Sequence, residues 1–286
     1  MHARSWRAGV PRAAPQAPCS FGWVKYGLHI PNFGPFGSAR VVADLAERAE
    51  ASCWDGVFIW DHIVRREGDY DVVDPWVALS AAAVATTRVA LGPLVTPLPR
   101  RRPWNVAKAA VSLDHLSEGR VVLGVGIGTP RGPEFQAFGE ETDTRVRGDM
   151  LDEALTIVRA AWSGKAVTFA GEHYRVDGVR FLPRPYRDRA IPIWAATESV
   201  QGRPVRRAAM LDGVFPFGIE TARLPLLANA VSRARPGGPP FEIVGVSKID
   251  DADVWEAAGA TWWLRELPWG QPLEVSEALV ADGPRR

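Results

Sequence analysis

Two hydrophobic periodicities alternate along the chain from Val24 onward. Short runs such as Val24–Ile30, Gly56–Trp60 and Arg120–Ile127 are apolar on both faces, which is typical of parallel strands that are covered on both sides. Between such runs lie longer segments with apolar residues three or four positions apart, for example Thr144–Trp162, which is typical of an amphipathic helix. The alternation predicts a series of strand–helix units.

The remaining elements follow the same alternation. Further strands are predicted at Val89–Val95, Ile191–Ala195, Gly213–Phe217, Phe241–Val246 and Thr261–Leu264. Further helices are predicted at Ser38–Ser52, Asp74–Thr86, Pro103–Ser117, Pro204–Met210, Thr221–Ala234, Asp253–Ala258 and Leu273–Val280, with Ser38 and Asp74 as N-caps. Residues Ala166–Val176 interrupt the series and predict an inserted β-hairpin that turns at Ala170-Gly171.

Eight strand–helix units within about 260 residues predict an α/β fold, the (β/α)8 TIM barrel with a short inserted hairpin. The alternative is an open doubly wound sheet. Its nucleotide fingerprint is absent, because Gly124, Gly126 and Gly128 are followed by Pro130 and Pro133, which cannot open the required helix.

The barrel domain is predicted to comprise residues 24–286, preceded by a disordered tail over residues 1–23. The tail has three arginines and no acidic residue, and it lacks the continuous apolar segment of a signal peptide. We hypothesise that Val24 is the true start of the protein, since an obvious strand begins there.

Composition narrows the class of protein. A net charge of +1 gives no general preference for nucleic acid, and no apolar run reaches the roughly 18 residues that a membrane span needs. The two cysteines, Cys19 and Cys53, form no disulfide framework in this interpretation, and no secretory pattern is present, so the cytoplasm is the expected compartment. Isolated cysteines, and histidines without ligand spacing, indicate no metal site.

In a TIM barrel the residues just after each strand form the functional face. His62, after the second strand, is the best candidate for chemistry, because imidazole exchanges protons near neutral pH. Asp61 beside it is predicted to bind the cofactor. The alternative is that Asp61 and His62 only determine the conformation of the loop. The run Arg100-Arg101-Arg102 is interpreted as a solvated loop.

Two further strand ends indicate a ligand. Alternating glycines at 124, 126 and 128 allow close approach to the backbone, either by a flat ligand or by a neighbouring side chain. The segment AATESVQGRPVRRAAM at the fifth strand end predicts a phosphate cradle of free amides and a helix start, with Arg203 or Arg206 nearby. The alternative for this segment is a plain surface helix with basic residues.

Several stretches together resemble the luciferase-like family of flavin-dependent oxidoreductases. They include YGLHIPNFG, AERAEASCWDGVFIWDHI, NVAKAAVSLDHLSEGRVVLGVGIG and RGDMLDEALTIVRAAWSG, and the resemblance extends from about Val24 to nearly the C-terminus. It implies a barrel that binds either flavin mononucleotide (FMN) or 8-hydroxy-5-deazaflavin (coenzyme F420) over the C-terminal strand ends. The cofactor then supplies the chemistry, and the protein positions it and the substrate.

The resemblance also implies roles for particular residues. His62 matches a histidine that deazaflavin members use near the ring, and Thr96 matches the third-strand end on which the ring rests. Gly126 and Gly128 match glycines against which the ring lies. The residues implied to hold the cofactor phosphate are Thr197, Glu198, Ser199 and Gly202. Some deazaflavin dehydrogenases have a catalytic glutamate just after the fourth strand, but here Thr129-Pro130-Arg131 occupy that place and Glu134 is shifted.

The leading interpretation is a luciferase-like monooxygenase that uses reduced flavin and oxygen on a small organic substrate. A separate flavin reductase would supply the reduced flavin. One alternative is a deazaflavin-dependent hydride-transfer oxidoreductase. A second is a non-catalytic flavin-binding barrel. Dimerisation is common in the family, so a homodimer is expected, and no nucleic-acid or membrane partner is expected.

Overall fold

The computed structural model describes residues 23–65, 68–129, 132–249 and 251–284. The expected tail comprises residues 1–23, of which all but Trp23 lie outside these ranges, and so does the segment on which the hypothesis that Val24 is the start depends. Within the described residues, no helix combines the length and the apolar character that a membrane crossing requires.

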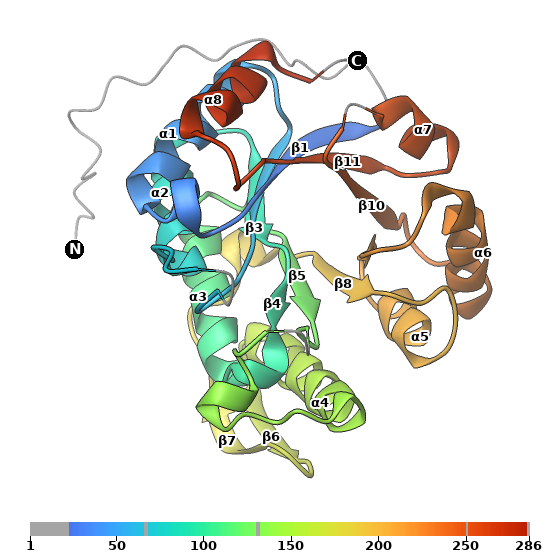
Figure 1. Ribbon diagram of the computed structural model, residues 1–286. Helices are drawn as coiled ribbons and strands as arrows, with labels where there is room; N and C mark the ends of the chain where they lie inside the picture. The colour runs from blue at the N-terminus through green and yellow to red at the C-terminus, as the bar shows by residue number, and fades with distance from the viewer. Residues whose placement is uncertain (1–22, 66–67, 130–131, 250, 285–286) are drawn as a thin grey trace.

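Parallel strands form a nearly closed barrel surrounded by helices, as predicted (Figure 1). The strands pair in the order β3-β2-β1-β11-β10-β9-β8-β5-β4, and a Leu91–Val121 bridge links the two ends of the sheet. The barrel strands are β1 (Lys25–Ile30), β2 (Gly56–Ile59), β3 (Ala90–Pro93), β4 (Thr96–Pro97), β5 (Leu123–Gly126), β8 (Ile193–Thr197), β9 (Gly213–Pro216), β10 (Glu242–Ser247) and β11 (Trp262–Glu266).

The helices match the predicted ones to within a few residues at each end. They are α1 (Ala39–Ala51), α2 (Pro75–Ala85), α3 (Pro103–Leu116), α4 (Thr144–Trp162), α5 (Arg203–Ala209), α6 (Leu224–Ala234), α7 (Ala252–Ala257) and α8 (Leu273–Asp282). Asp74 caps α2 by accepting bonds from the amides of Trp76 and Val77 at 2.9 and 3.1 Å. Ser38 occupies the N-cap position of α1, but its side chain makes no capping bond.

Three details differ from the predicted elements. The strand expected at Val89–Val95 ends earlier, at Pro93, as β3, and a separate two-residue strand, β4, follows at Thr96–Pro97, beyond the predicted end. The Leu94–Val95 peptide bond between the two pieces is cis. Cys53 is disulfide-bonded, which the sequence interpretation did not expect.

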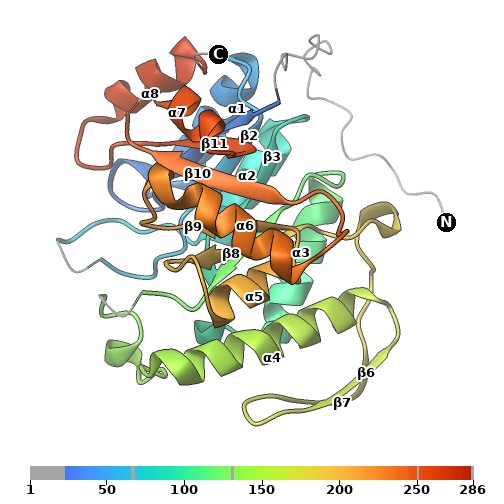
Figure 2. The same ribbon diagram turned by 90° about the vertical axis from the view of Figure 1, so that its right-hand side faces the viewer.

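The hairpin consists of β6 (Ala166–Ala170) and β7 (Arg175–Arg180), so its second strand extends beyond the predicted end at Val176. It lies outside the barrel beside α4 (Figure 2). Glu153 of α4 fixes the turn, because its carboxylate accepts hydrogen bonds from the amides of residues 172–174 at 2.7 to 3.0 Å.

Aromatic rings fill the inside of the barrel. The rings of Phe58, Trp194 and Trp262 lie with centroids 5.2 to 5.5 Å apart. Gly213 leaves room for one of them, since a Cβ there would lie 2.4 Å from Cδ1 of Trp194. A packed interior of this kind confines any ligand to the carboxyl ends of the strands.

Candidate functional site

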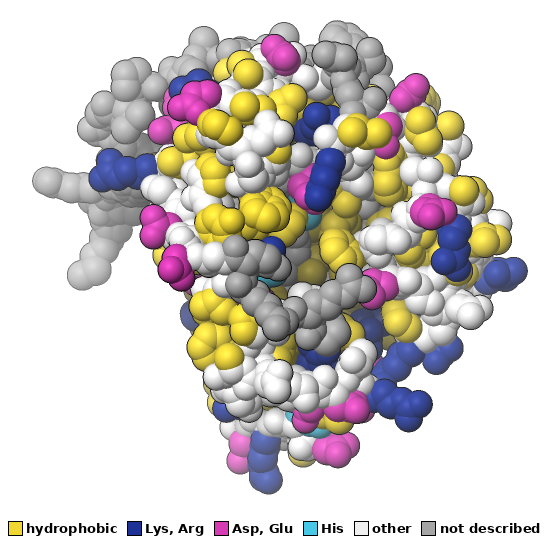
Figure 3. All heavy atoms as spheres, in the orientation of Figure 1, with side chains coloured by type: hydrophobic (Ala, Val, Ile, Leu, Met, Phe, Trp, Pro, Cys, Tyr) yellow, Lys and Arg dark blue, Asp and Glu magenta, His cyan; other side chains and the backbone are white. Residues whose placement is uncertain are grey.

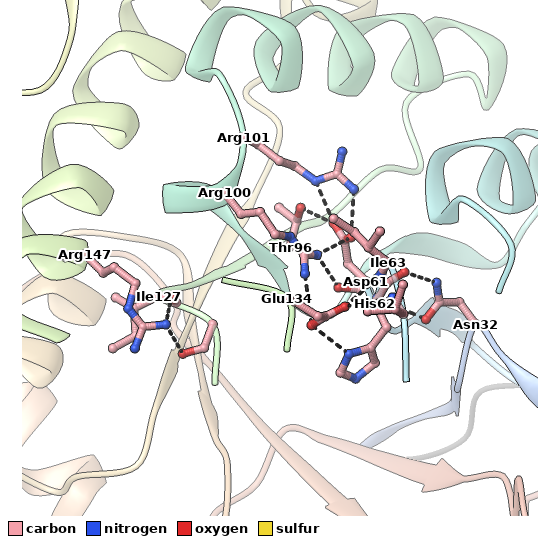
Figure 4. Close-up of polar contacts among 12 residues, drawn as sticks. Asn32, Asp61, His62, Ile63, Thr96, Arg100, Arg101, Ile127, Glu134 and Arg147 are labelled. Atoms are coloured by element: carbon pink, nitrogen blue, oxygen red, sulfur yellow. Dashed lines mark hydrogen bonds and ion pairs between the residues drawn. The ribbon is translucent and has the colours of Figure 1, made fainter. Parts of the chain in front are cut away.

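The loops after β1, β2, β4 and β5 bring distant residues together at the carboxyl end of the barrel (Figure 4). The space-filling view is hollowed near the middle of the molecule, with apolar side chains around the opening and histidine visible beside it (Figure 3). Asp61, His62, Thr96 and Glu134, which are far apart in the sequence, belong to one hydrogen-bonded network here.

Asp61 anchors two arginines rather than standing alone in the loop. Its carboxylate pairs with Arg100 at 3.0 Å and with Arg101 at 2.7 and 2.9 Å, and it accepts a hydrogen bond from Thr96 Oγ1. Asp61 and Thr96 are both buried. Their side chains are therefore engaged with each other and with the arginines, and their predicted contact with a cofactor stays a prediction.

The interpretation of the arginine run as a solvated loop is wrong for its first member. The Arg100 side chain is only 2% exposed, and its guanidinium bridges Asp61 and Glu134, with 2.9 Å between Nη1 and Glu134 Oε2. Arg100 is the last residue of the short 3-10 turn Leu98–Arg100 that follows β4, and this position directs its side chain into the network. A buried guanidinium requires carboxylate partners, which the adjacent loops supply.

His62 is held at the edge of the network. Its Nδ1 lies 3.0 Å from Glu134 Oε2, and its side chain is 17% exposed. Buried Asn32 fixes the loop by accepting a bond from the amide of His62 and donating to its carbonyl oxygen. The rings of Phe33 and Trp60 lie with centroids 5.8 and 5.6 Å from the imidazole. These contacts restrict His62 to a narrow range of orientations.

Glu134 is ionised in this setting. Burial by itself would raise the pKa of its carboxyl group, but the hydrogen bond with His62 and the positive charge of Arg100 outweigh burial and lower the pKa to about 2. The amide of Ile63 adds a hydrogen bond to Oε1 at 2.5 Å. The site thus contains a buried carboxylate joined to the candidate histidine.

The glycines at the end of β5 have a packing role. A Cβ on Gly126 would lie 2.9 Å from Val95 Cγ2, and one on Gly128 would lie 2.5 Å from the Phe135 ring. Gly128 also has a positive φ of 77°. Of the two alternatives at these positions, close approach by a neighbouring side chain is what the structure contains, and contact with a cofactor stays a prediction.

Arg147 on α4 reaches the same strand end. It is fully buried and donates to the carbonyl oxygens of Ile127 and Gly128 at 3.2 and 3.3 Å (Figure 4). Its guanidinium also lies over the Phe135 ring. Its Nε has no hydrogen-bond partner, and none of the described carboxylates lies within 4.0 Å of it. Burial lowers the pKa of this guanidinium. The negative charges of Glu141 and Asp143 offset this effect only in part. A buried cation whose charge is only partly compensated is costly, so an anionic group would be stabilised here.

The loop after β8 is ordered by its own hydroxyl groups. Thr197 Oγ1 donates to the carbonyl oxygen of Ser199 and accepts from its amide, and Ser199 Oγ bonds in the same way to Gln201. Gly202, with φ of 80°, precedes α5. Glu198, in the same loop, forms no hydrogen bond or ion pair with the described residues.

Arg203, expected near a cofactor phosphate, is paired with carboxylates of α4. Its guanidinium pairs with Asp149 at 2.5 Å and with Asp152 at 2.6 Å, and the bond with Asp149 is the main cause that raises its pKa. The charge of Arg203 is therefore already balanced by α4, and its predicted contact with a cofactor stays a prediction.

The comparisons with known proteins agree with this geometry. The model of a family described as luciferase-like monooxygenase matches residues 22–263. The chain belongs to the luciferase-like monooxygenase family. Membership in this family is what the sequence resemblance implied.

Two relatives of this luciferase-like protein have F420 in their names. An F420-dependent glucose-6-phosphate dehydrogenase of Nakamurella multipartita is 34% identical over 226 residues, which is 76% of this chain and 63% of that protein. An F420-dependent hydroxymycolic acid dehydrogenase of Mycobacterium tuberculosis is 34% identical over 268 residues, covering 86% of this chain and 70% of the relative. The chain thus spans less than two thirds of the first relative.

Solved structures support the fold. An F420-dependent secondary alcohol dehydrogenase in complex with an F420–acetone adduct superposes with a TM-score of 0.74 at 18% identity, over 90% of this chain and 99% of that one. The coenzyme F420-dependent tetrahydromethanopterin reductase of Methanopyrus kandleri gives 0.72 at 14% identity, over 91% and 98%. At these identities the similarity establishes the barrel.

Sequence reasoning missed Glu134, Arg100 and Arg147 as parts of the site of this luciferase-like protein. Glu134 is displaced in the sequence from the position of the family glutamate. Arg147 lies in a helix whose pattern is set by its apolar residues. Position after a strand would have indicated Arg100. No local signal distinguishes Arg147, because its burial depends on packing of α4 against the segment that follows β5. Among the described residues, no group of three or more His, Cys, Asp or Glu side chains is arranged to hold a metal ion.

Proposed function

We propose that this luciferase-like protein is a deazaflavin-dependent dehydrogenase that oxidises a hydroxyl-bearing small organic molecule, or reduces the corresponding carbonyl. The observation that carries the proposal is the placement of His62, a partly exposed imidazole held by a buried carboxylate at the barrel mouth. The F420-dependent dehydrogenases at 34% identity support this cofactor over FMN. The substrate itself stays undefined.

The residues at the mouth of the barrel fit the phosphate group of such a cofactor. Both FMN and F420 carry phosphate, and the buried Arg147, with its unpartnered Nε and no carboxylate among the described residues in contact, is suited to balance that charge. The amides of the Thr197–Gly202 loop and the backbone at Gly126 and Gly128 are the further candidates for holding the cofactor. When bound, the deazaflavin supplies a two-electron hydride acceptor or donor.

The protein's own contribution to the reaction is a proton acceptor. During oxidation the C–H electron pair leaves as hydride, and the hydroxyl proton passes to His62 Nε2, so that a C=O bond forms and atoms and charge balance. Nε2 has no hydrogen-bond partner among the described residues. Phe33 and Trp60, packed beside the imidazole, keep its surroundings apolar and limit access of water.

The test is a titration of the purified protein with F420 and with FMN, each oxidised and reduced, followed by tryptophan fluorescence. The proposal expects selective binding of F420 and F420 reduction by alcohols without oxygen. His62→Ala should lower turnover by about 10²- to 10⁴-fold, the range for a lost general base, with little change in the cofactor Kd. His115→Ala is the matched control, since His115 lies on α3 and contacts the carbonyl oxygen of Arg184.

A second candidate function is the FMN-dependent monooxygenase, which the description of the family favours. It requires reduced FMN from a separate flavin reductase, consumes oxygen and inserts an oxygen atom into the substrate. Tight binding of reduced FMN together with oxygen uptake would support it and would overturn the deazaflavin proposal.

We also propose that the protein is a homodimer. Helix α2 is apolar all round, and Val77 and Val84 on its outer face are 57% and 54% exposed. A helix that is apolar on all sides is usually covered. Light scattering should give twice the 31.2 kDa mass of the chain, and Val84→Glu should shift it to the monomer mass. A monomer in the unchanged protein would refute the proposal.

A further inference from the structure

His62, Glu134 and Arg100 form a chain of contacts that the overall reaction does not by itself require. His62 Nδ1 and Arg100 Nη1 both contact Oε2 of Glu134, at 3.0 and 2.9 Å. The other oxygen, Oε1, accepts from the amides of Ile63 and Val64 at 2.5 and 3.4 Å. Glu134 is therefore fixed from both sides, with a side chain that is 5% exposed.

The ionisation of Glu134 decides the direction of the hydrogen bond with His62. The hydrogen bond from His62 and the charge of Arg100 overcome burial and keep the pKa of Glu134 at about 2, so the group is a carboxylate at neutral pH. An ionised carboxylate has no hydrogen to donate. The hydrogen in this bond must therefore be carried by Nδ1.

We propose that Glu134 is a positioning residue that holds neutral His62 as the Nδ1–H tautomer and thereby leaves the Nε2 lone pair facing the mouth as the proton acceptor. This proposal rests on the proposed function for its consequence, but the tautomer itself does not depend on it. The second ring nitrogen of a histidine is set by the bond that the first one makes. A fixed carboxylate behind the ring also stabilises the imidazolium that forms during the reaction.

Two arginines and two carboxylates form the ion-paired network behind the ring. Arg100 and Arg101 carry two positive charges, and Asp61 and Glu134 carry two negative ones. Arg65 lies nearby over the ring of Phe33, which itself contacts His62. When Nε2 accepts a proton, the positive charge of the imidazolium is stabilised by the Glu134 carboxylate at Nδ1. The positive charge of Arg100 favours the ionised form of Glu134, so the proton stays on the ring.

The direct test is nitrogen NMR of the full chain labelled with ¹⁵N-histidine, without cofactor or substrate. His62→Gln identifies the His62 signals. The unchanged protein should show His62 protonated at Nδ1 and unprotonated at Nε2 above neutral pH. Glu134→Ala should convert this signal to a mixture of the two tautomers, whereas Glu140→Ala, in the same loop and without contact to His62, should leave it unchanged.

Activity gives the second readout. Glu134→Gln keeps the shape and an acceptor oxygen but removes the charge, so the acid limb of the kcat/KM profile should move to lower pH. Glu134→Ala should lower kcat by about 10²- to 10⁴-fold with little change in KM, because losing the orienting carboxylate costs the correct tautomer.

The outcomes separate this proposal from the proposed function. A His62 protonated at Nε2 in the unchanged protein, or a tautomer unaffected by Glu134→Ala, would overturn the role of Glu134 whatever the reaction is. The predicted tautomer without F420-dependent activity would support the role of Glu134 and reject the proposed function. If Glu134→Ala does not fold, the signal of the unchanged protein and the pH profile of Glu134→Gln still decide.

Discussion

Replacing Glu134 by Gln should change the dependence of stability on pH in a way that can be calculated. The substitution keeps the size of the side chain and removes its charge. The native carboxyl group has a pKa of about 2, against 4.5 for the same group in the unfolded chain. Because the native value is the lower one, the carboxylate stabilises the folded protein above about pH 4.5, and this stabilisation is lost as the pH falls toward 2.

The size of the effect follows from the difference between the two values. This difference in pKa corresponds to roughly 3 kcal/mol of unfolding free energy at pH 7. Between pH 7 and pH 3.5 the unfolded chain gains most of a proton and the folded chain gains almost none, so about 1 kcal/mol is lost. The gap in unfolding free energy between the unchanged protein and Glu134→Gln should therefore narrow from about 3 to about 2 kcal/mol over this range.

Urea unfolding followed by tryptophan fluorescence at a series of pH values measures this gap. Groups that titrate independently of Glu134 affect both proteins equally and cancel in the comparison. Glu140→Gln provides the control, since it removes a charge from the same loop without contacting His62 or Arg100. A gap for Glu134→Gln that does not change with pH would refute the assignment of a strongly ionised, ion-paired Glu134.

Three other substitutions test the remaining contacts. Asp61→Asn leaves the two arginines without their shared carboxylate and should cost about 3 to 5 kcal/mol of unfolding free energy, measured by urea unfolding; a loss near that of an exposed residue would contradict the buried network. Glu153→Ala removes the acceptor for three amides of the hairpin turn, so hydrogen exchange at residues 172–174 should accelerate while the barrel strands stay protected. Gly92→Ala would place a Cβ 1.7 Å from the carbonyl oxygen of Val122, so the melting temperature should fall steeply, and a fully stable variant would argue against this barrel packing.

The hydrophobic pattern was sufficient for the architecture. Short runs that are apolar on both faces, and segments with apolar residues three or four positions apart, are local properties of the chain. Their alternation predicted the eight units, because buried parallel strands and amphipathic helices each require their own pattern. The same pattern placed His62 directly after a strand, and hence at the functional face. The ends of elements were less certain: β3 ends at Pro93, two residues before the predicted end, although the segment stays apolar through Val95.

Only the tertiary structure decided which side chains contact one another. Glu134 and His62 are 72 positions apart, and they meet because the loops after β2 and β5 converge at one end of the barrel. The burial of Arg100 and Arg147 likewise depends on which elements pack over them, and no local spacing encodes it. The sequence determined which chemical groups lie near the strand ends, and closure of the barrel determined their neighbours, their ionisation and the direction of their hydrogen bonds.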